Sequence, residues 1–155
     1  MRRAQGLIEH LFMLAVAIGV VAFTIYVVIG LLSTNSENPK VVISYVDYNP
    51  PGSDVSGEYV LITNEGSADV DMGGWKLMDE SNHVYTFPAG FILKAGASVK
   101  VHTGEGTDTE TDLYWGRKQA VWNNDGDTAY LYDAEGNLVD SCSWSGKEGG
   151  AVSCH

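Results

Sequence analysis

Basic residues are scarce in this chain, which has nine Lys and Arg against twenty Asp and Glu. Because a nucleic-acid partner requires Lys and Arg to neutralise its phosphates, we expect no nucleic acid to bind. The chain also lacks His-Glu-x-x-His, Gly-x-Ser-x-Gly and a Gly-rich phosphate loop, and its histidines after the N-terminal region are scattered: His83, His102 and His155. We therefore expect no enzyme, no catalytic residue and no required cofactor.

Other absences narrow the class of protein further. The sequence has no internal repeat and no low-complexity tract. It also has no Asn-x-Ser/Thr sequon, so N-linked glycosylation by that rule is not expected.

The most prominent feature present is an unbroken apolar run over residues 11–32. As a helix it would span roughly 33 Å, enough for a hydrocarbon core about 30 Å thick. Arg2 and Arg3 precede the run and the next basic residue is Lys40, so the N-terminus is expected in the cytoplasm and the rest outside. Because the run is too long for a cleavable secretory signal, we expect the helix to be retained.

Glu9 lies at the start of this run, where an ionised side chain in a bilayer costs on the order of 3 kcal/mol at most. The string Gln5-Gly6-Leu7-Ile8-Glu9 resembles the class III signal peptide of archaeal type IV pilins, in which a short basic leader is removed ahead of a retained helix. The resemblance implies a leader over 1–4, cleavage between Ala4 and Gln5, and a helix over 5–33. The family usually has Gly at the position of Ala4.

The pilin resemblance also implies a role for Glu9 in assembly. In a filament core, its carboxylate would meet the freed amine of Gln5 on a neighbouring subunit and set the axial register. The implied partners are other copies in a helical filament, a prepilin peptidase, the pilus assembly machinery and, before assembly, the membrane. The alternative is an uncleaved single-pass anchor in which Glu9 and His10 lie in the headgroup layer.

The chain beyond the helix is an acidic head. Without Arg2, Arg3 and Glu9, the basic residues number seven and the acidic residues nineteen, a net charge of −12. A polar linker over 34–40 contains Pro39, and residues 41–155 suffice for one domain. Seven segments rich in β-branched and aromatic residues, separated by turn residues, predict an antiparallel immunoglobulin-like β-sandwich: 41–47, 58–64, 74–78, 83–87, 98–103, 128–133 and 138–144. No second helix is expected.

Two local patterns within these segments are informative. Residues 59–64 and 98–103 alternate, with Val99 and Val101 on the opposite face to Lys100 and His102. Residues 133–137, which include Gly136, predict a hairpin over 130–139.

The head resembles a lamin-tail domain. The resemblance is carried, in the family's order, by EYVLITN at 58–64, VDMGGWKL at 70–77, YTFP at 85–88 and WNNDGDTAYL at 122–131. It implies an immunoglobulin-like sandwich of the kind found in nuclear lamins and in many secreted prokaryotic proteins. It implies no reaction, since such a domain is joined to varied partners.

The segment 122–127 has two interpretations. Its Asn, Asp and Gly residues are typical of a turn that bonds its own backbone, with Trp122 closing the end of the sandwich. Alternatively, Asp125 and Asp127, with Asp79 or Asp108, would bind Ca²⁺ through oxygen ligands, although the EF-hand order is absent.

Cys142 and Cys154 are the only cysteines. Outside the cell, an even pair predicts a disulfide, which would tie the tail 146–153 to the last strand and contribute about 3 kcal/mol if unstrained. The alternative is metal binding by two thiols with His155.

The head is also rich in aromatic side chains, which we expect mostly to pack on the core or sheet faces. Any exposed ones would contact neighbouring heads or a surface target such as a glycan: Tyr114, Trp115, Tyr130, Tyr132 and Trp144.

Together these features predict a structural subunit of an extracellular archaeal type IV pilus, with its helix in the filament core and its head outward for adhesion or surface attachment. The competing hypothesis is an uncleaved, membrane-anchored surface module that binds a cation, a glycan or a protein. The sequence leaves open whether a pilin of this kind is the main subunit or a minor one at the filament tip.

Overall fold

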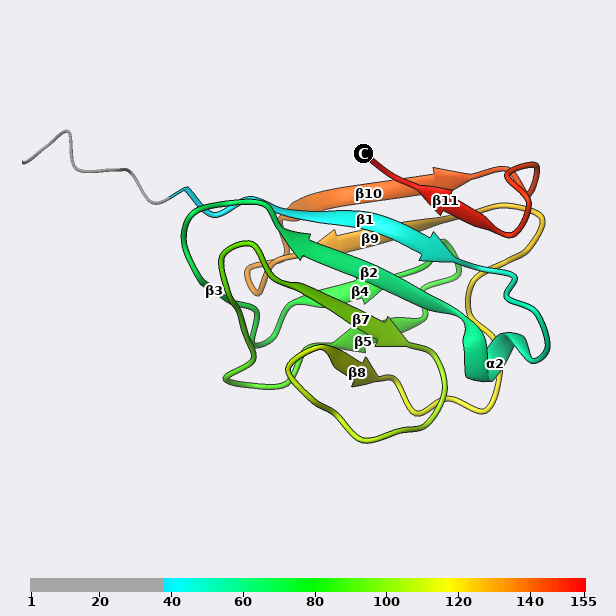
Figure 1. Cartoon of the computed structure of the whole chain (residues 1–155), viewed down its shortest axis with the longest axis horizontal. Helices are drawn as coiled ribbons and strands as arrows, with labels where there is room; N and C mark the ends of the chain where they lie inside the picture. The colour runs from blue at the N-terminus through cyan, green and yellow to red at the C-terminus, as the bar shows by residue number, and fades with distance from the viewer. Residues whose placement is uncertain (1–37) are drawn as a thin grey trace, which may run out of the picture. The chain divides into compact units, whose positions relative to one another are not determined.

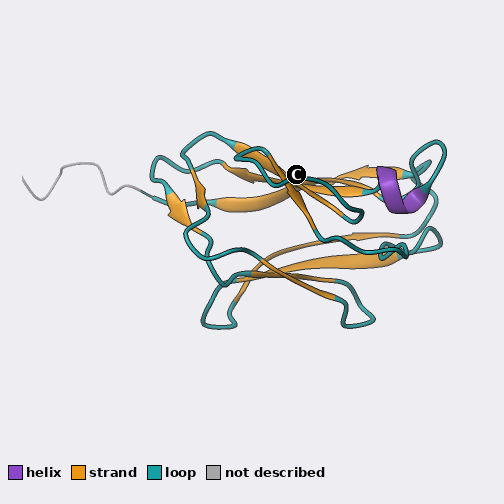
Figure 2. Cartoon of the chain, turned by 90° about the horizontal axis from the view of Figure 1, so that it is seen from below, coloured by secondary structure: helices purple, strands orange, loops and turns teal. Residues whose placement is uncertain are grey.

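The computed structural model describes residues 38–155 as two β-sheets packed face to face (Figure 1, Figure 2). The predicted leader, the predicted helix over 5–33 and most of the linker lie outside the described residues. Within residues 38–155, no helix has the length and apolar character needed to span a membrane. The predicted immunoglobulin-like sandwich is confirmed for this part of the chain.

The larger sheet has five strands in the order β11-β1-β2-β7-β8. They are β1 (Val41–Asp47), β2 (Tyr59–Asn64), β7 (Ser98–His102), β8 (Asp112–Tyr114) and β11 (Ala151–Ser153). Neighbouring strands are antiparallel except β7 and β8, which run parallel. The prediction of a fully antiparallel sandwich was wrong at this edge, because a long loop after β7 returns the chain to the starting end of that strand.

The smaller sheet has four strands in the order β10-β9-β4-β5, and a separate two-stranded ribbon pairs β3 with β6. The bounds are β4 (Lys76–Met78), β5 (Val84–Thr86), β9 (Asp127–Tyr132), β10 (Leu138–Trp144), β3 (Val70–Asp71) and β6 (Ile92–Leu93). A single-turn helix, α2 (Asp54–Gly57), precedes β2 and corrects the expectation of no second helix.

The predicted hairpin over 130–139 is confirmed as the turn between β9 and β10. The side chain of Asp133 accepts backbone N–H bonds from Glu135 at 3.0 Å and Asn137 at 2.8 Å. Gly136 has a φ of 87°, the left-handed conformation that glycine adopts without a steric penalty. The turn is therefore encoded by local sequence.

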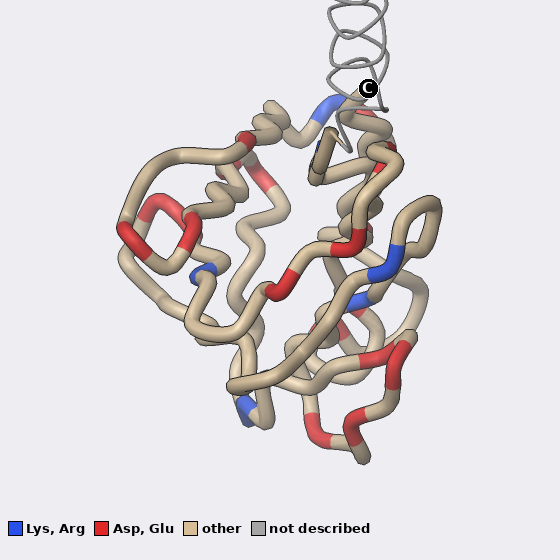
Figure 3. The backbone as a smooth tube through the Cα atoms, turned by 90° about the vertical axis from the view of Figure 1, so that its left-hand side faces the viewer, with Lys and Arg blue, Asp and Glu red and all other residues tan. Residues whose placement is uncertain are grey.

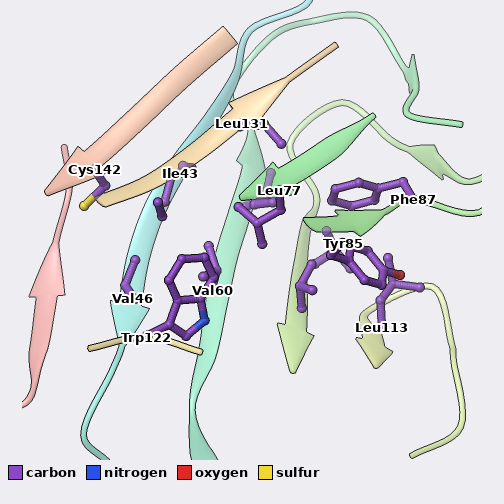
Figure 4. Packing of buried hydrophobic residues seen from close by; sticks show 14 of the residues in the cluster. Ile43, Val46, Val60, Leu77, Tyr85, Phe87, Leu113, Trp122, Leu131 and Cys142 are labelled. Atoms are coloured by element: carbon purple, nitrogen blue, oxygen red, sulfur yellow. The ribbon is translucent and has the colours of Figure 1, made fainter. Parts of the chain in front are cut away.

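The core lies between the two sheets and follows the predicted alternation (Figure 4). Val60 and Ile62 of β2 and Val99 and Val101 of β7 are fully buried, while their sequence neighbours on these strands are partly exposed. Each such side chain contributes about 1.5–3 kcal/mol relative to leaving it in water.

A disulfide joins the two sheets at one edge of the sandwich. The predicted disulfide is present, with 5.6 Å between the Cα atoms of Cys142 and Cys154. Cys142 belongs to β10 and Cys154 follows β11, so the bond joins the smaller sheet to the larger one. Beside it, the Asp140 carboxylate accepts the backbone N–H of Ile43 at 2.7 Å and lies 2.8 Å from Nε2 of His155. With both sulfurs bonded to each other, the alternative of a two-thiol metal site is excluded.

Candidate functional site

An acidic cleft of about 460 Å³ lies beside α2. Figure 1 shows the position of α2 at one end of the sandwich. Three separate segments form it: α2, the loop between β4 and β5, and the segment that leads into β9. Its carboxylates are Asp54, Asp79, Glu80, Asp125 and Asp127. Since a carboxylate-lined cleft repels anions, this end of the head favours neutral or positively charged partners.

Asp127 organises the loops around the cleft. Its Oδ1 accepts backbone N–H bonds from Thr128 at 2.8 Å and Glu80 at 3.1 Å, and its Oδ2 accepts one from Asn123 at 3.1 Å. The side chain of Asn123 in turn accepts the N–H of Asp125 at 3.0 Å. This geometry is the backbone-bonding turn predicted for 122–127.

Trp122 and Trp144 close the same end of the core. Trp122 is 2% exposed and packs edge-to-face against Trp144, with 6.0 Å between ring centroids. The indole N–H of Trp144 donates to the backbone carbonyl of Asn123 at 2.8 Å. The prediction that Trp122 closes the end of the sandwich is consistent with this packing (Figure 4).

The geometry gives no support to the calcium prediction. Asp127 directs its oxygens at backbone amides, and both oxygens of Asp79 are bonded to His83, at 2.7 Å to its N–H and 2.6 Å to Nδ1. Asp108 lies on the loop before β8, where it accepts the N–H of Tyr114 at 2.9 Å. Residues 38–155 contain no group of three or more His, Cys, Asp or Glu side chains placed to hold a metal ion.

Glu58 holds two residues that line the cleft, Val121 and Trp122, from the buried side. Its side chain is fully buried, and Oε1 accepts backbone N–H bonds from Val121 at 2.6 Å and Trp122 at 3.4 Å. Burial raises the pKa of this carboxyl, while the amide of Val121 acts in the opposite direction. Sequence reasoning missed this residue, and the available signal was a carboxylate beginning an otherwise apolar segment.

The three histidines of the described chain each lie close to an aspartate. The pairs are His83 with Asp79 at 2.6 Å, His102 with Asp112 at 2.7 Å and His155 with Asp140 at 2.8 Å. The hydrogen bond from His102 lowers the pKa of Asp112. Within residues 38–155, no Ser, Thr or Cys side chain is hydrogen-bonded to any of these rings, so no activated nucleophile is assembled there.

The aromatic residues singled out from the sequence fall into two groups. Trp144 stacks on Tyr48, with 5.0 Å between centroids, and Tyr114 stacks on His102 at 4.6 Å. Tyr130 and Tyr132 lie next to each other on β9, with 6.3 Å between ring centroids. These two tyrosines are partly exposed, as are Tyr114 and Trp115. Trp115 packs against the core beside Trp122.

The residues predicted for leader processing and assembly, Ala4, Gln5 and Glu9, lie outside the described residues. For the remainder of the chain, comparison with known protein families gives a match to the Lamin Tail Domain over residues 34–146. The matched range includes the cleft and strands β1 to β10, and it ends before β11 and Cys154.

Proposed function

This chain belongs to the lamin tail domain family. On the residues of its N-terminus, we propose that it is a structural subunit of an extracellular archaeal type IV pilus. The family's immunoglobulin-like domain is a structural and binding fold rather than a catalytic one. In the proposal, residues 5–33 pack as a helix in the filament core and the acidic head faces outward.

The observation that carries the proposal is the order of residues at the N-terminus. Arg2 and Arg3 precede Gln5 and Glu9, and the apolar run over 11–32 follows directly. A membrane anchor accounts for the arginines and the apolar run, but it gives no reason for a carboxylate at the start of that run. Pairing of Glu9 with the amine of Gln5 on a neighbouring subunit supplies one.

Two properties of the head support an extracellular location. Disulfides such as Cys142–Cys154 persist mainly in oxidising compartments outside the cytoplasm. The acidic residues are spread along the backbone of the head (Figure 3), which suits a soluble surface in an ionic medium. In this proposal, the prepilin peptidase and assembly machinery act on a membrane-inserted precursor whose N-terminus is cytoplasmic.

A second candidate is an uncleaved membrane-anchored binding module, favoured by the acidic cleft at the α2 end of the head. The filament proposal also includes adhesion or surface attachment, with the same end available to a target.

A substitution at Glu9 distinguishes a filament subunit from a membrane-anchored binding module. Glu9→Ala should weaken each subunit addition about tenfold, which corresponds to about 1.4 kcal/mol, and should therefore lower the yield of sheared surface filaments strongly. Glu37→Ala removes a carboxylate from the linker and is the matched control. Filament yield equal to that of the unmodified chain in Glu9→Ala would exclude the proposed assembly role.

A further inference from the structure

The sandwich has an end, which we call the linker end, that holds the beginning of β1, the end of β2 and the ribbon of β3 and β6. Val41 of β1 is opposite Asn64 of β2, and the side chain of Asn64 donates to the backbone carbonyl of Leu93 in β6 at 3.1 Å. Figure 1 shows β3 and the beginning of β1 at the end opposite α2. The residues that follow the apolar run over 11–32 therefore lead into the head at the linker end.

A mostly apolar groove of about 490 Å³, which we call the linker-end groove, lies between β6, the beginning of β7 and the loop before β8. Residues 90–94, 97–98 and 109–111 line it, with Phe91 and Ile92 as its large apolar side chains on the open side. Its lining holds one cation, Lys94, and one carboxylate, Glu110, so the groove itself carries little net charge.

Exposed hydrophobic side chains gather at the linker end. Only three large hydrophobic residues of 38–155 are exposed: Val84, Ile92 and Leu138. Ile92 belongs to the groove, and Leu138 is close to the same end, because Asp140 two residues later bonds the N–H of Ile43 near the beginning of β1. Grouped exposed apolar side chains mark a contact surface more often than scattered ones do.

The length of chain ahead of Asn38 limits how far the linker end can be from a membrane. In the precursor of the proposed function, the apolar run ends at Leu32 in the bilayer, and residues 33–38 connect it to the head. Six residues span at most about 22 Å when fully extended, whereas a domain of this size is roughly 35 Å across. The linker end is therefore held at the bilayer surface, where the short connection keeps even a weak contact populated.

We propose that the linker-end groove contacts the outer surface of the membrane in the inserted precursor, with Phe91 and Ile92 placed at the boundary between lipid headgroups and acyl chains. The inference rests on the membrane insertion that the proposed function includes. Apolar side chains gain stability when they leave water for this boundary. The contact would hold the head against the membrane until the subunit is extracted for assembly.

Charge determines which membrane surface the groove prefers. Lys40 at the linker end is paired with Glu65 at 2.7 Å, so it has a partner within the head. Other carboxylates are also present at this end, which Figure 3 views directly: Asp69, Asp71, Glu110 and Asp133. Because these groups are repelled by anionic headgroups, the contact is apolar in origin and favours lipids without net charge.

Photo-crosslinking of the full chain in phosphatidylcholine vesicles tests this assignment. Benzoylphenylalanine replaces Ile92, which is 43% exposed, or Val84, which is 41% exposed and follows the cleft residue His83. Mass spectrometry should find lipid adducts on the Ile92 variant and about fivefold fewer on the Val84 control, because crosslinking requires direct contact. The same replacement at exposed Lys94, which also lines the groove, provides a second probe if the Ile92 variant does not fold.

The lipid composition tests the origin of the contact. Replacing about one third of the phosphatidylcholine by phosphatidylglycerol should lower the adduct yield at Ile92 about threefold at low salt, and about 0.5 M sodium chloride should restore it. An attraction between lysines and lipid phosphates would give the opposite result.

The membrane contact is overturned by the absence of lipid adducts at both Ile92 and Lys94, by equal adducts at Val84, or by adducts that increase with anionic lipid. Adducts to protein alone would also overturn it, since another polypeptide then occupies the groove. A chain that assembles into filaments but gives no lipid adduct leaves the proposed function intact. Lipid adducts on an inserted chain that never enters filaments contradict that function and retain the membrane contact. A chain that alkaline carbonate releases from the vesicles refutes both.

Discussion

Glu58→Gln should stabilise the head relative to the unmodified chain, and this stabilisation should be larger at neutral pH than at acidic pH. The Glu58 side chain is fully buried, and Oε1 holds the amides of Val121 and Trp122. Its second oxygen, Oε2, is buried and has no hydrogen-bond partner among residues 38–155. Glutamine keeps the accepting oxygen and cannot ionise, so the substitution isolates the effect of the buried charge.

The sign follows from the direction of the pKa shift. Burial raises the folded-state pKa of Glu58 above its usual 4.5, so the folded protein holds this proton more tightly than the unfolded chain does. The resulting stability is fully present below pH 4.5 and is lost as the pH rises through the folded pKa. Because glutamine does not ionise, Glu58→Gln should not lose stability in this way as the pH rises. Glu58→Ala instead leaves two buried amides unpaired and should cost about 2–5 kcal/mol at every pH.

Denaturant unfolding of the disulfide-intact full chain in detergent, followed by tryptophan fluorescence, measures both effects. The comparison is made at pH 4 and pH 7, with Glu105→Gln as an exposed control of the same chemistry. The difference between Glu58→Gln and the unmodified chain should become more favourable to the variant at pH 7. An identical pH dependence for the two proteins, or full stability of Glu58→Ala, would refute the reasoning.

Three further measurements test other contacts. Replacing Cys142 and Cys154 together by Ser should cost about 3 kcal/mol in denaturant unfolding, because the bond closes a short loop; equal stability would contradict a structural role. Asp127→Ala should cost about 2–4 kcal/mol, and exposed Asp125→Ala less than about 0.5; similar costs would refute the assigned turn. Asp112→Asn should remove a small stabilisation that is lost as pH falls through the lowered folded pKa of Asp112, measured by unfolding at pH 7 and pH 3.

Strands with a local pattern were predictable from the sequence. The ranges 41–47 and 138–144 match β1 and β10, and the other five predicted strands end within two residues of those observed. In β2 and β7 burial alternates every second residue, a pattern that the chain encodes without reference to distant contacts. The hairpin at Gly136 was predictable for the same reason.

The strands that were missed depend on distant partners. β8 has three residues and is held by parallel pairing with β7, while β3 and β6 have two residues each and pair only with one another. β11 was expected to be tail without strand character, yet it pairs with β1 beside the disulfide. Such short segments carry too few residues for a period to be visible.

The candidate site was predictable only where its residues are adjacent in sequence. The turn over 122–127 follows from its own Asn, Asp and Gly residues. The cleft does not, because Asp54 and Glu80 reach it from separate loops. The role of Glu58 depends on Val121, which is 63 residues away in the chain.

Mass spectrometry of the native N-terminus, on the chain isolated from sheared surface filaments, tests the filament account most directly. The account predicts that this chain is a filament protein and begins at Gln5, with Met1 to Ala4 removed. A chain that retains Arg2 and Arg3, or one found in the membrane and absent from filaments, would contradict it.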